Sequence, residues 1–417
     1  MKKFLRFAEQ GFAILGLLFL SGAFGIGSMG DVLPAALVSL IRYLVWFGST
    51  IIVVYEWKKT LLIGIRDLCL LTLTLLSLLS FSWSIFPDFT YSNMKEVLMM
   101  TFFGIYLATR FSLKEQVQLI AQTLLIGAFL SIFFALVIPG VGKHGADHPG
   151  AWKGIFGYKN NLGSMMVLNS LAFFSLPKKT PFLYRWGVFV LSLVLMLLST
   201  SKTSLVLSFL LIFMISFYKN FRWQGKISVI FVDIGVLVLG CVSVIVLSNW
   251  VEIISGLGKD PTITGRTPLW SHAIYRLMER PFFGYGRGAY WAPGSKYAYE
   301  ARVADWIPPH AHNGFIDIAL DIGLIGLSLF LISYLITFFI SLKRAYGTED
   351  REELLPLAFL ILLAMNNMTE SYLMHLTNLY WPVYISFALT LRKKKPKPKL
   401  ATPEKKLFSA HIKITTR

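Results

Sequence analysis

The sequence predicts an all-α, polytopic integral membrane protein with about twelve transmembrane helices. Hydrophobic residues make up 55% of the 417 positions, charged residues only 15%, and the mean hydropathy is +0.62. Apolar runs of roughly twenty residues, the length that crosses a bilayer, recur along nearly the whole chain. They leave no room for a large soluble domain, so we expect one membrane domain over 1–391 and a separate tail over 392–417.

Each predicted span is an apolar run with almost no charge. The spans lie at about 11–27, 33–55, 64–86, 93–110, 115–138, 160–176, 184–200, 203–218, 227–248, 314–340, 353–368 and 375–391. Only Thr200, Ser201 and Lys202 separate the two spans between 184 and 218, so the exact boundaries there stay open.

The Lys and Arg residues lie where cytoplasmic loops are expected. The formal net charge is +18, and ten of the 40 Lys and Arg residues follow Tyr384. Most of the others form short clusters beside apolar spans, such as Lys58 with Lys59 and Lys343 with Arg344. This positive-inside pattern predicts that both termini are cytoplasmic. Because no basic stripe alternates with exposed aromatics, the pattern argues against nucleic-acid binding.

The first apolar segment has two interpretations. Met1, Lys2 and Lys3, followed by an apolar run and then by Ser21, Gly22 and Ala23, resemble a cleavable signal peptide. We favour an uncleaved first span, because twelve helices with both ends inside agree with the charge pattern. At the other end of the chain, the basic, Pro-containing tail over 392–417 is expected to be disordered.

Two long connections are predicted to face outward, into the periplasm. They cover about 139–159 and 249–313. Within the second, Thr267 suits a helix N-cap and Pro268 suits the first helical position. Apolar residues then recur at helical spacing, which predicts an amphipathic helix on the outer leaflet that covers a cavity.

Several outward cations have no explanation in the positive-inside rule. Arg266, Lys202, Arg280 and Lys159 could bind a diphosphate, since Arg offers a planar fork of donors and Lys a mobile charge. The alternative is a solvated loop that bonds lipid head groups. We favour diphosphate binding for Arg266 and Lys202, and the head-group alternative for a second set, namely Arg276, Arg287, Lys259 and Lys296.

His310 and His312 lie just before Asn313 and the entry to the long span that begins at Gly314. A neutral imidazole can accept a proton from a sugar hydroxyl, which suits a general base at the membrane surface. The alternative is a histidine that satisfies backbone groups of its loop. Two residues apart in an extended loop, the two rings are not expected to point the same way, so at most one is expected to be catalytic.

The sequence does not predict a metal site. The histidines have no HExxH pattern or Cys partner, and the chain lacks an Asp-x-Asp pair of the kind that holds a metal under a nucleotide-sugar diphosphate. Cys69 and Cys241 both fall in predicted spans. We therefore expect neither a metal nor a disulfide framework.

Three ionisable residues inside spans are supporting candidates. Asp317 and Asp321, four residues apart, share a helix face near the outer end of their span. They could orient a histidine, or cap the helix and pair with loop arginines. Arg42 lies near the middle of the second span, where an ionisable group usually faces the bundle interior.

Five short motifs, taken together and in this order, resemble the O-antigen ligase and polymerase superfamily. They are Gly157-Tyr158-Lys159-Asn160-Asn161-Leu162-Gly163, Ser201-Lys202-Thr203-Ser204-Leu205, Gly265-Arg266 with Leu269-Trp270, Arg280-Pro281-Phe282-Phe283-Gly284-Tyr285-Gly286, and His312-Asn313 with Gly323-Leu324-Ile325-Gly326-Leu327. The remaining helices agree with the superfamily only in number and hydropathy. The stretch from His148 to Gly163 is most similar to its exopolysaccharide polymerase branch.

The resemblance implies a metal-independent, inverting membrane glycosyltransferase that needs no cofactor and works on the outer face of the bacterial inner membrane. Its donor would be a glycan on undecaprenyl diphosphate, and its acceptor a lipid A core sugar or another lipid-linked repeat unit. It implies that Arg266 and Lys202 hold the diphosphate and that His312 activates the acceptor. Lys202 stands where relatives usually have Arg, which loses bidentate contact. Tyr158 stands where many relatives have His.

Two other functions remain open. One is a transporter or flippase of the same lipid-linked oligosaccharide, although the paired halves and broken helices typical of transporters are not evident. The other is a structural scaffold among polysaccharide assembly partners. The sequence also leaves open whether the enzyme is a ligase or a polymerase. It does not identify the sugar, the linkage, the control of chain length or the oligomeric state.

Overall fold

The computed structural model describes residues 2–220, 226–248, 266–302, 306–346, 348, 350–375 and 378–393. Within these ranges the regular structure is helical, apart from an isolated β-bridge between Lys143 and Trp152. The predicted all-α class is therefore confirmed for these ranges. Residues 394–417 of the tail and 249–265 of the second long loop lie outside them.

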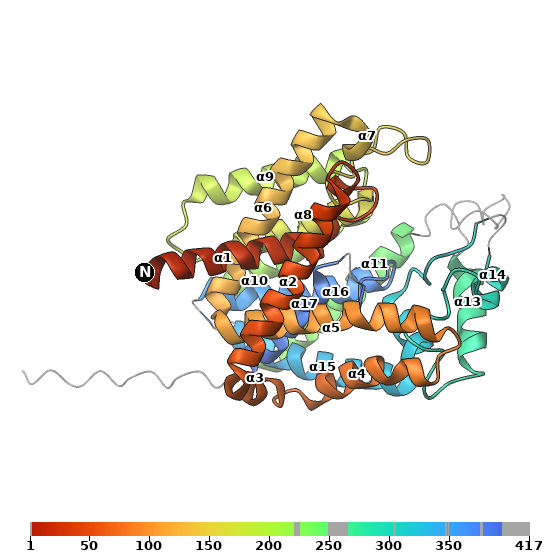
Figure 1. The fold of residues 1–417 in the computed structure, drawn as a ribbon. Helices are drawn as coiled ribbons and strands as arrows, with labels where there is room; N and C mark the ends of the chain where they lie inside the picture. The colour runs from red at the N-terminus through yellow and green to blue at the C-terminus, as the bar shows by residue number, and fades with distance from the viewer. Residues whose placement is uncertain are drawn as a thin grey trace, which may run out of the picture.

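The helices follow the chain in the order shown in Figure 1. They are α1 (Lys2–Leu18), α2 (Ala35–Tyr55), α3 (Trp57–Gly64), α4 (Leu68–Leu79), α5 (Pro87–Arg110), α6 (Leu113–Val137), α7 (Pro139–Gly142), α8 (Lys159–Phe174), α9 (Phe182–Leu198), α10 (Lys202–Asn220), α11 (Lys226–Ser248), α13 (Arg266–Leu277), α14 (Lys296–Glu300), α15 (Gly314–Ala345), α16 (Leu354–Asn367) and α17 (Tyr380–Leu391). Short π or 3-10 turns lie at Phe19–Ala23, Met29–Asp31, Ser80–Ser82 and Arg351–Glu353.

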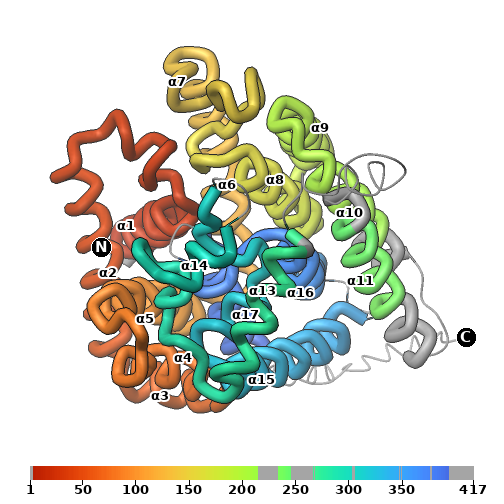
Figure 2. Tube along the Cα trace, turned by 90° about the vertical axis from the view of Figure 1, so that its right-hand side faces the viewer, coloured from red at the N-terminus to blue at the C-terminus, as the bar shows by residue number. Residues whose placement is uncertain are grey.

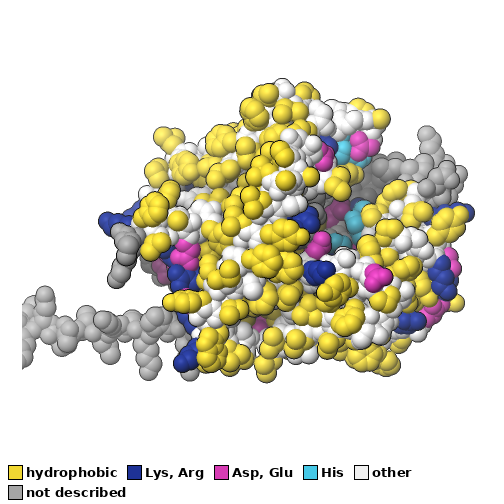
Figure 3. All heavy atoms as spheres, in the orientation of Figure 1, with side chains coloured by type: hydrophobic (Ala, Val, Ile, Leu, Met, Phe, Trp, Pro, Cys, Tyr) yellow, Lys and Arg dark blue, Asp and Glu magenta, His cyan; other side chains and the backbone are white. Residues whose placement is uncertain are grey.

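Every predicted span coincides with a helix, yet fewer helices qualify as spans by themselves. In the described ranges, four helices are long and apolar enough to cross a membrane, or five if the bent pair α3 and α4 forms one span. The surface carries a broad belt of hydrophobic side chains, with most of the charged side chains toward its two ends (Figure 3). The chain is therefore a multi-pass membrane protein, and the count of twelve spans stays a prediction.

The centre of the bundle is formed by α16 and α17. Every residue of these two helices is buried, which is typical of a helix that is apolar on all sides and surrounded by others. α17 packs against α5, and α16 packs against α15 and α8. Figure 2 shows both central helices in blue, behind α13 and α14. The loop between them therefore emerges in the middle of one end of the bundle.

The basic clusters gather at the end of the bundle where α5 stops. Arg110 pairs with Glu9 at 2.6 Å and with Glu56, and Lys393 Nζ donates to the Ala108 carbonyl at 2.5 Å. At the start of α5, the Ile85 N–H donates to the Tyr285 carbonyl at 3.1 Å. The basic clusters and the 266–313 segment thus lie at opposite ends of α5, roughly 36 Å apart at 1.5 Å per residue. This separation agrees with the predicted sidedness.

α15 is broken at Gly323, and the preceding loop fills the break. Gly323 has φ +73°, and its neighbour Ile322 also leaves the helical region. The carbonyl of Leu320, which loses its helical partner there, accepts from the Tyr285 N–H at 2.8 Å, and the Leu324 N–H donates to the Pro281 carbonyl at 2.7 Å. Because backbone groups exchange in both directions, the break docks the 281–286 loop at a fixed position.

We predict that Gly323→Ala destabilises the protein by about 3 kcal/mol, because its backbone conformation is almost exclusive to glycine. A Cβ atom at this position would also lie 1.9 Å from the Phe282 carbonyl oxygen. Thermal unfolding in detergent measures the effect. Gly187→Ala, at a helical site in α9 with open space around it, is the control and should be neutral or stabilising. Equal melting temperatures for the two variants would contradict the role assigned to the break.

Candidate functional site

A cavity of about 380 Å³ opens at the end of the bundle opposite the basic clusters. Figure 3 shows histidine side chains gathered at a hollow on the side of the molecule that carries α13 and α14. The cavity is lined by the loop before α15, the loop between α16 and α17, and the start of α8. Its lining residues are Tyr158, Asn161, Trp306, Pro309, His310, His312, Glu370, Ser371, Tyr372, His375 and Asn378.

Glu370, in the loop after α16, connects the two principal predicted residues. Its Oε2 lies 3.5 Å from His312 Nδ1, and its Oε1 lies 3.8 Å from Arg266 Nη2. Asn160 Nδ2 also donates to Oε1 at 2.8 Å. The distance to His312 suits an ion pair but exceeds a typical hydrogen bond. Arg266 and His312, 46 positions apart in the sequence, therefore meet across one carboxylate.

The surroundings of Glu370 favour its charged form. Burial alone would raise the pKa of its carboxyl, but contact with His312 and the positive charge of Arg266 outweigh burial, and the pKa is lowered overall. The side chain keeps 17% of its surface exposed, so its environment is a cavity wall rather than a dry core. An ionised Glu370 can hold a proton on His312 Nδ1, which leaves Nε2 as the basic nitrogen.

The expectation that the two histidines point apart is wrong. Their ring centroids are only 4.1 Å apart, and both rings line the cavity. The reason is the backbone of His312, whose φ of +51° turns the chain so that both side chains face the same side. Non-glycine residues adopt this conformation rarely, and most often where the surroundings impose it.

His310 binds the backbone of its own loop as well as lining the cavity. Its Nδ1 accepts from the backbone N–H of His312 at 3.2 Å, which is the backbone role considered as the alternative for these histidines. Burial, together with the neighbouring His312 ring and the positive charge of Arg266, lowers the pKa of His310 to about 4. A neutral His310 with Nδ1 occupied carries its proton on Nε2 and presents a donor to the cavity.

A clamp on Ala311 fixes the histidine loop from both sides. The Ala311 N–H donates to Asp317 Oδ1 at 3.0 Å, and its carbonyl accepts from Trp270 Nε1 at 2.8 Å. Trp270 lies one helical turn after Arg266 on α13, so this bond also fixes the helix that carries Arg266. Asp317 accepts in addition from Trp291 Nε1 at 2.8 Å and from the Ser371 hydroxyl next to Glu370.

Asn313 and Asp321, which lie on either side of Asp317 in the sequence, both have structural partners. Asn313 is the N-cap of α15, and its side chain accepts from the Phe315 and Ile316 N–H groups. Asp321 forms a buried ion pair with Arg287 at 2.6 Å, and Arg287 also donates to the Met374 carbonyl at 2.6 Å. This pair connects α15 to the loop that carries Glu370, so Arg287 holds the fold together instead of facing a ligand.

A small polar cavity of about 40 Å³ adjoins the first and shares Glu370 and Tyr372 with it. Arg266 lines it, and its buried Nη1 has no hydrogen-bond partner among the described residues. The other walls supply hydroxyl and amide groups, from Asn160, Ser164, Ser201, Thr203, Ser204, Asn366 and Thr369. Such a ring of donors around an arginine suits phosphate oxygens.

The remaining predicted cations lie at varying distances from this site. Lys202 is exposed at the start of α10, while its neighbours Ser201 and Thr203 line the polar cavity. Lys159 begins α8, between Tyr158 and Asn160 of the cavity walls. Arg280 lines a different cavity with Trp83, Phe282 and Phe283, and its guanidinium lies over the Tyr285 ring. Arg42 is exposed on α2, although an interior position was expected.

Sequence reasoning missed Glu370, Tyr372 and His375, all of which line the cavity. They lie in the connection between two central helices, where Asn366, Asn367, Thr369, Glu370 and Ser371 follow an apolar run. That cluster of polar residues at the mouth of a buried helix was the available signal. Among the described residues, no group of three or more His, Cys, Asp or Glu side chains is arranged to hold a metal ion.

Comparison with known proteins agrees with the motifs. Residues 187–331 match the family model described as O-antigen ligase. A segment of 104 residues is 38% identical to the exopolysaccharide production protein ExoQ of Rhizobium meliloti, over 24% of each chain. A segment of 79 residues is 32% identical to the Rickettsia conorii protein named "Putative polysaccharide ligase RC0486", over 18% of this chain and 19% of that one. The matches thus span about a quarter or less of these relatives, and the predicted family resemblance is confirmed.

We predict that Asp317→Ala costs about 2–4 kcal/mol, because three buried donors lose their acceptor. Hydrogen exchange at the Ala311 amide should also become faster, since that amide donates to Asp317. Thermal unfolding and hydrogen exchange of the 306–313 segment measure the two effects. Asp88→Ala, at an exposed carboxylate on α5, is the control. If exchange around Ala311 is as slow in Asp317→Ala as in the control, the clamp does not hold the loop.

We predict that stability falls as the pH drops from about 6.5 to about 4. The pKa of His310 is about 4 in the folded protein and about 6.5 in an unfolded chain, so the unfolded chain binds more protons in this window. His310→Asn keeps an acceptor for the His312 N–H but does not titrate. The melting-temperature difference between about pH 7 and about pH 5 should therefore be smaller in the variant. An unchanged difference would show that His310 is not the titrating group.

Proposed function

We propose that this chain, which carries an O-antigen ligase family segment over residues 187–331, is a membrane glycosyltransferase that moves a glycan from undecaprenyl diphosphate to a sugar hydroxyl. One observation carries the proposal. Glu370 lies within 4 Å of both the guanidinium of Arg266 and the imidazole of His312. A group that binds phosphate and a group that accepts a proton thus border one cavity, as a transfer from a diphosphate to a hydroxyl requires.

The donor diphosphate is assigned to the polar cavity. The unpartnered Nη1 of Arg266 offers a charged donor, and Thr203 and Ser204 offer hydroxyl groups. Lys202, an exposed residue between the lining residues Ser201 and Thr203, adds a positive charge, and Lys159 can supply a second one. These groups stabilise the negative charge that develops on the departing diphosphate, a role worth several kcal/mol in a poorly solvated site. Arginine and lysine thereby take the part that a metal plays in other transferases.

The acceptor is assigned to the larger cavity, next to His312. Glu370 keeps the imidazole proton on Nδ1, so the unprotonated Nε2 removes the proton from the acceptor hydroxyl. The hydroxyl oxygen then bonds to the anomeric carbon of the donor while the bond from that carbon to the diphosphate oxygen breaks. The diphosphate leaves with the electron pair of that bond. Attack from the face opposite the leaving group inverts the anomeric configuration.

The distance of 3.5 Å between His312 Nδ1 and Glu370 Oε2 can shorten during the reaction. Catalytic hydrogen bonds are often loose without substrate and shorten when it binds. A positive charge on His312 after proton transfer would draw Glu370 closer, and Arg266 would move from Glu370 toward the diphosphate. Glu370 therefore balances Arg266 before the donor binds and the imidazolium after the proton moves.

The position of the cavity supports an outward-facing enzyme of the inner membrane. It lies at the end of α5 opposite the basic clusters, and these clusters are expected to be cytoplasmic. A donor whose diphosphate lies at the outer leaflet would reach this end directly. The acceptor is then the sugar of another lipid-linked repeat unit or of a lipid A core, as in a polysaccharide polymerase or ligase.

We predict that His312→Ala and Arg266→Ala each lower the transfer rate at least about 100-fold, because they remove the base and the main phosphate ligand. Glu370→Gln should lower it at least about tenfold, because it removes the charge that balances the imidazolium. The measurement is the formation of glycan product from lipid-linked donor by purified protein in detergent. Arg66→Ala, at an exposed arginine in the turn between α3 and α4, is the matched control and should retain full activity.

Two results would contradict this assignment. One is wild-type turnover by His312→Ala with an intact melting temperature. The other is transport of the lipid-linked glycan across the membrane of vesicles together with no new glycosidic bond in detergent. An enzyme forms product in detergent, whereas a transporter needs a membrane between two compartments.

A further inference from the structure

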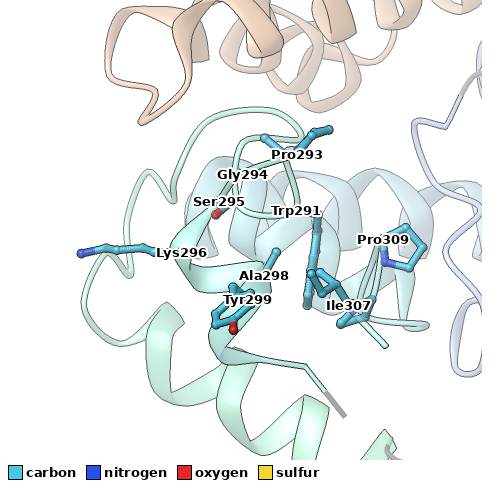
Figure 4. A pocket seen from close by; sticks show the side chains of 11 residues that line it. Trp291, Pro293, Gly294, Ser295, Lys296, Ala298, Tyr299, Ile307 and Pro309 are labelled. Carbon is cyan, nitrogen blue, oxygen red and sulfur yellow. The ribbon is translucent and has the colours of Figure 1, made fainter. Parts of the chain in front are cut away.

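A second cavity of about 400 Å³ lies beside the His312 cavity, and Pro309 lines both. Figure 4 shows it between α14 and the segment that leads to the histidines. Pockets of roughly 300–1,000 Å³ are the size that holds small organic ligands. Its lining residues are Trp291, Ala292, Pro293, Gly294, Ser295, Lys296, Ala298, Tyr299, Ile307, Pro308 and Pro309.

Two aromatic side chains form much of its wall. The Arg302 guanidinium lies over the Tyr299 ring, 4.5 Å from its centroid, and 54% of the Tyr299 surface stays exposed. In Figure 4, Trp291 stands between the 295–299 segment and Pro309. Its indole N–H is already bound by Asp317, so the ring face is the part of Trp291 left for the cavity. Aromatic faces carry partial negative charge and attract C–H groups that carry partial positive charge.

A single buried hydroxyl adds polar character. Ser295 is only 2% exposed, and its Oγ has no hydrogen-bond partner among the described residues. Ser295 occupies the N-cap position of α14, where a serine side chain usually accepts from the helix backbone, yet it makes no such bond. Buried hydroxyl groups without a partner are uncommon, because the lost bond to water is costly. Ser295 thus brings an unused hydrogen-bonding group to the lining of the cavity.

The described lining of the cavity presents little charge to its contents. Its described lining contains no carboxylate, and its one charged residue, Lys296, extends away from the other lining side chains in Figure 4. The Lys296 ammonium lies over the Tyr297 ring, 5.0 Å from its centroid. This described lining contains no arginine, in contrast to the cavity beside Arg266. The ligand that fits is uncharged, with an apolar face and a hydroxyl rim.

We propose that this cavity is a glycan subsite that binds one neutral sugar ring of the polysaccharide, next to the reacting end. A pyranose ring offers the apolar C–H face for Trp291 and Tyr299, and hydroxyl groups for Ser295. This inference rests on the proposed transferase function and adds to it a site for the sugar that follows the acceptor. The shared Pro309 places the two rings of such a chain in adjacent cavities.

Asp317 gives this subsite a rigid connection to the base. The same carboxylate binds the Trp291 indole N–H at 2.8 Å and the Ala311 N–H at 3.0 Å, one residue before His312. A sugar stacked on Trp291 is thereby held at a fixed position relative to the imidazole. Such positioning holds the hydroxyl of the next sugar in the neighbouring cavity beside the His312 imidazole, even if each contact with the glycan is weak.

The test is binding of lipid-free oligosaccharides, cut from the surface polysaccharide of the producing bacterium, to the full-length protein in detergent. Calorimetry or saturation-transfer NMR gives the affinity. Tyr299→Ala and Ser295→Ala should each weaken binding about tenfold, whereas Tyr299→Phe, which keeps the ring, should bind like the wild type. Tyr275→Ala, at a tyrosine on α13 that is 67% exposed and lines no cavity described above, is the matched control.

His312→Ala separates this inference from the proposed function. It should lose transfer, whereas adding Tyr299→Ala to His312→Ala should still weaken oligosaccharide binding about tenfold relative to His312→Ala alone, since His312 does not line this cavity. If the wild type does not bind the oligosaccharide, or if Tyr299→Ala with a normal melting temperature binds as well as Tyr275→Ala, the subsite is wrong while the transferase can still be right. If His312→Ala transfers normally, the base is wrong, and the binding results still decide the subsite.

Discussion

One buried carboxylate, that of Asp317, sets the geometry on which the candidate site depends. It accepts hydrogen bonds from the histidine loop, from Trp291 and from Ser371, which come from three separate segments of the chain. Burying a carboxylate is unfavourable unless donors surround it, so the three segments and Asp317 stabilise one another. The groups that face the cavities, His312, Glu370 and the Trp291 ring, are neighbours of these donors. Their relative positions therefore follow from the same set of bonds.

The long loop is held against the bundle mainly through backbone groups. The break in α15 leaves carbonyls of Leu320 and Asp321 for the 285–286 segment, and the Arg287–Asp321 pair adds a buried ion pair beside it. Polar bonds of this kind suit a loop at a membrane surface, where apolar contact alone gives little preference for one position over another. The result is a rigid base from which Arg266, on the preceding helix, reaches the loop between the two central helices.

Much of the fold was predictable from the sequence, because apolar runs determine helices in a membrane. All twelve predicted spans correspond to helices, but Thr267, the predicted cap of α13, lies within that helix. The site was harder to predict. Arg266 and His312 stood out as outward ionisable groups, whereas Glu370 is a lone acid in a short loop, and only the packing of α16 against α15 and α8 brings it between them. Arg280 has the same chemistry as Arg266, but the break in α15 docks its segment elsewhere. The left-handed backbone conformation of His312 turns both imidazoles into one cavity. The sequence does not reveal this conformation, because the residue is not a glycine.

Arg266 and His312 are proposed to act on two reactants that meet beside Glu370. The most direct measurement is a density map of the purified protein bound to a lipid-linked glycan. The diphosphate is expected within hydrogen-bonding distance of Arg266 and of the Ser201–Ser204 segment, with the anomeric carbon facing His312 Nε2. A diphosphate bound in the Arg280 cavity instead, with Arg266 still turned toward Glu370, would contradict the account.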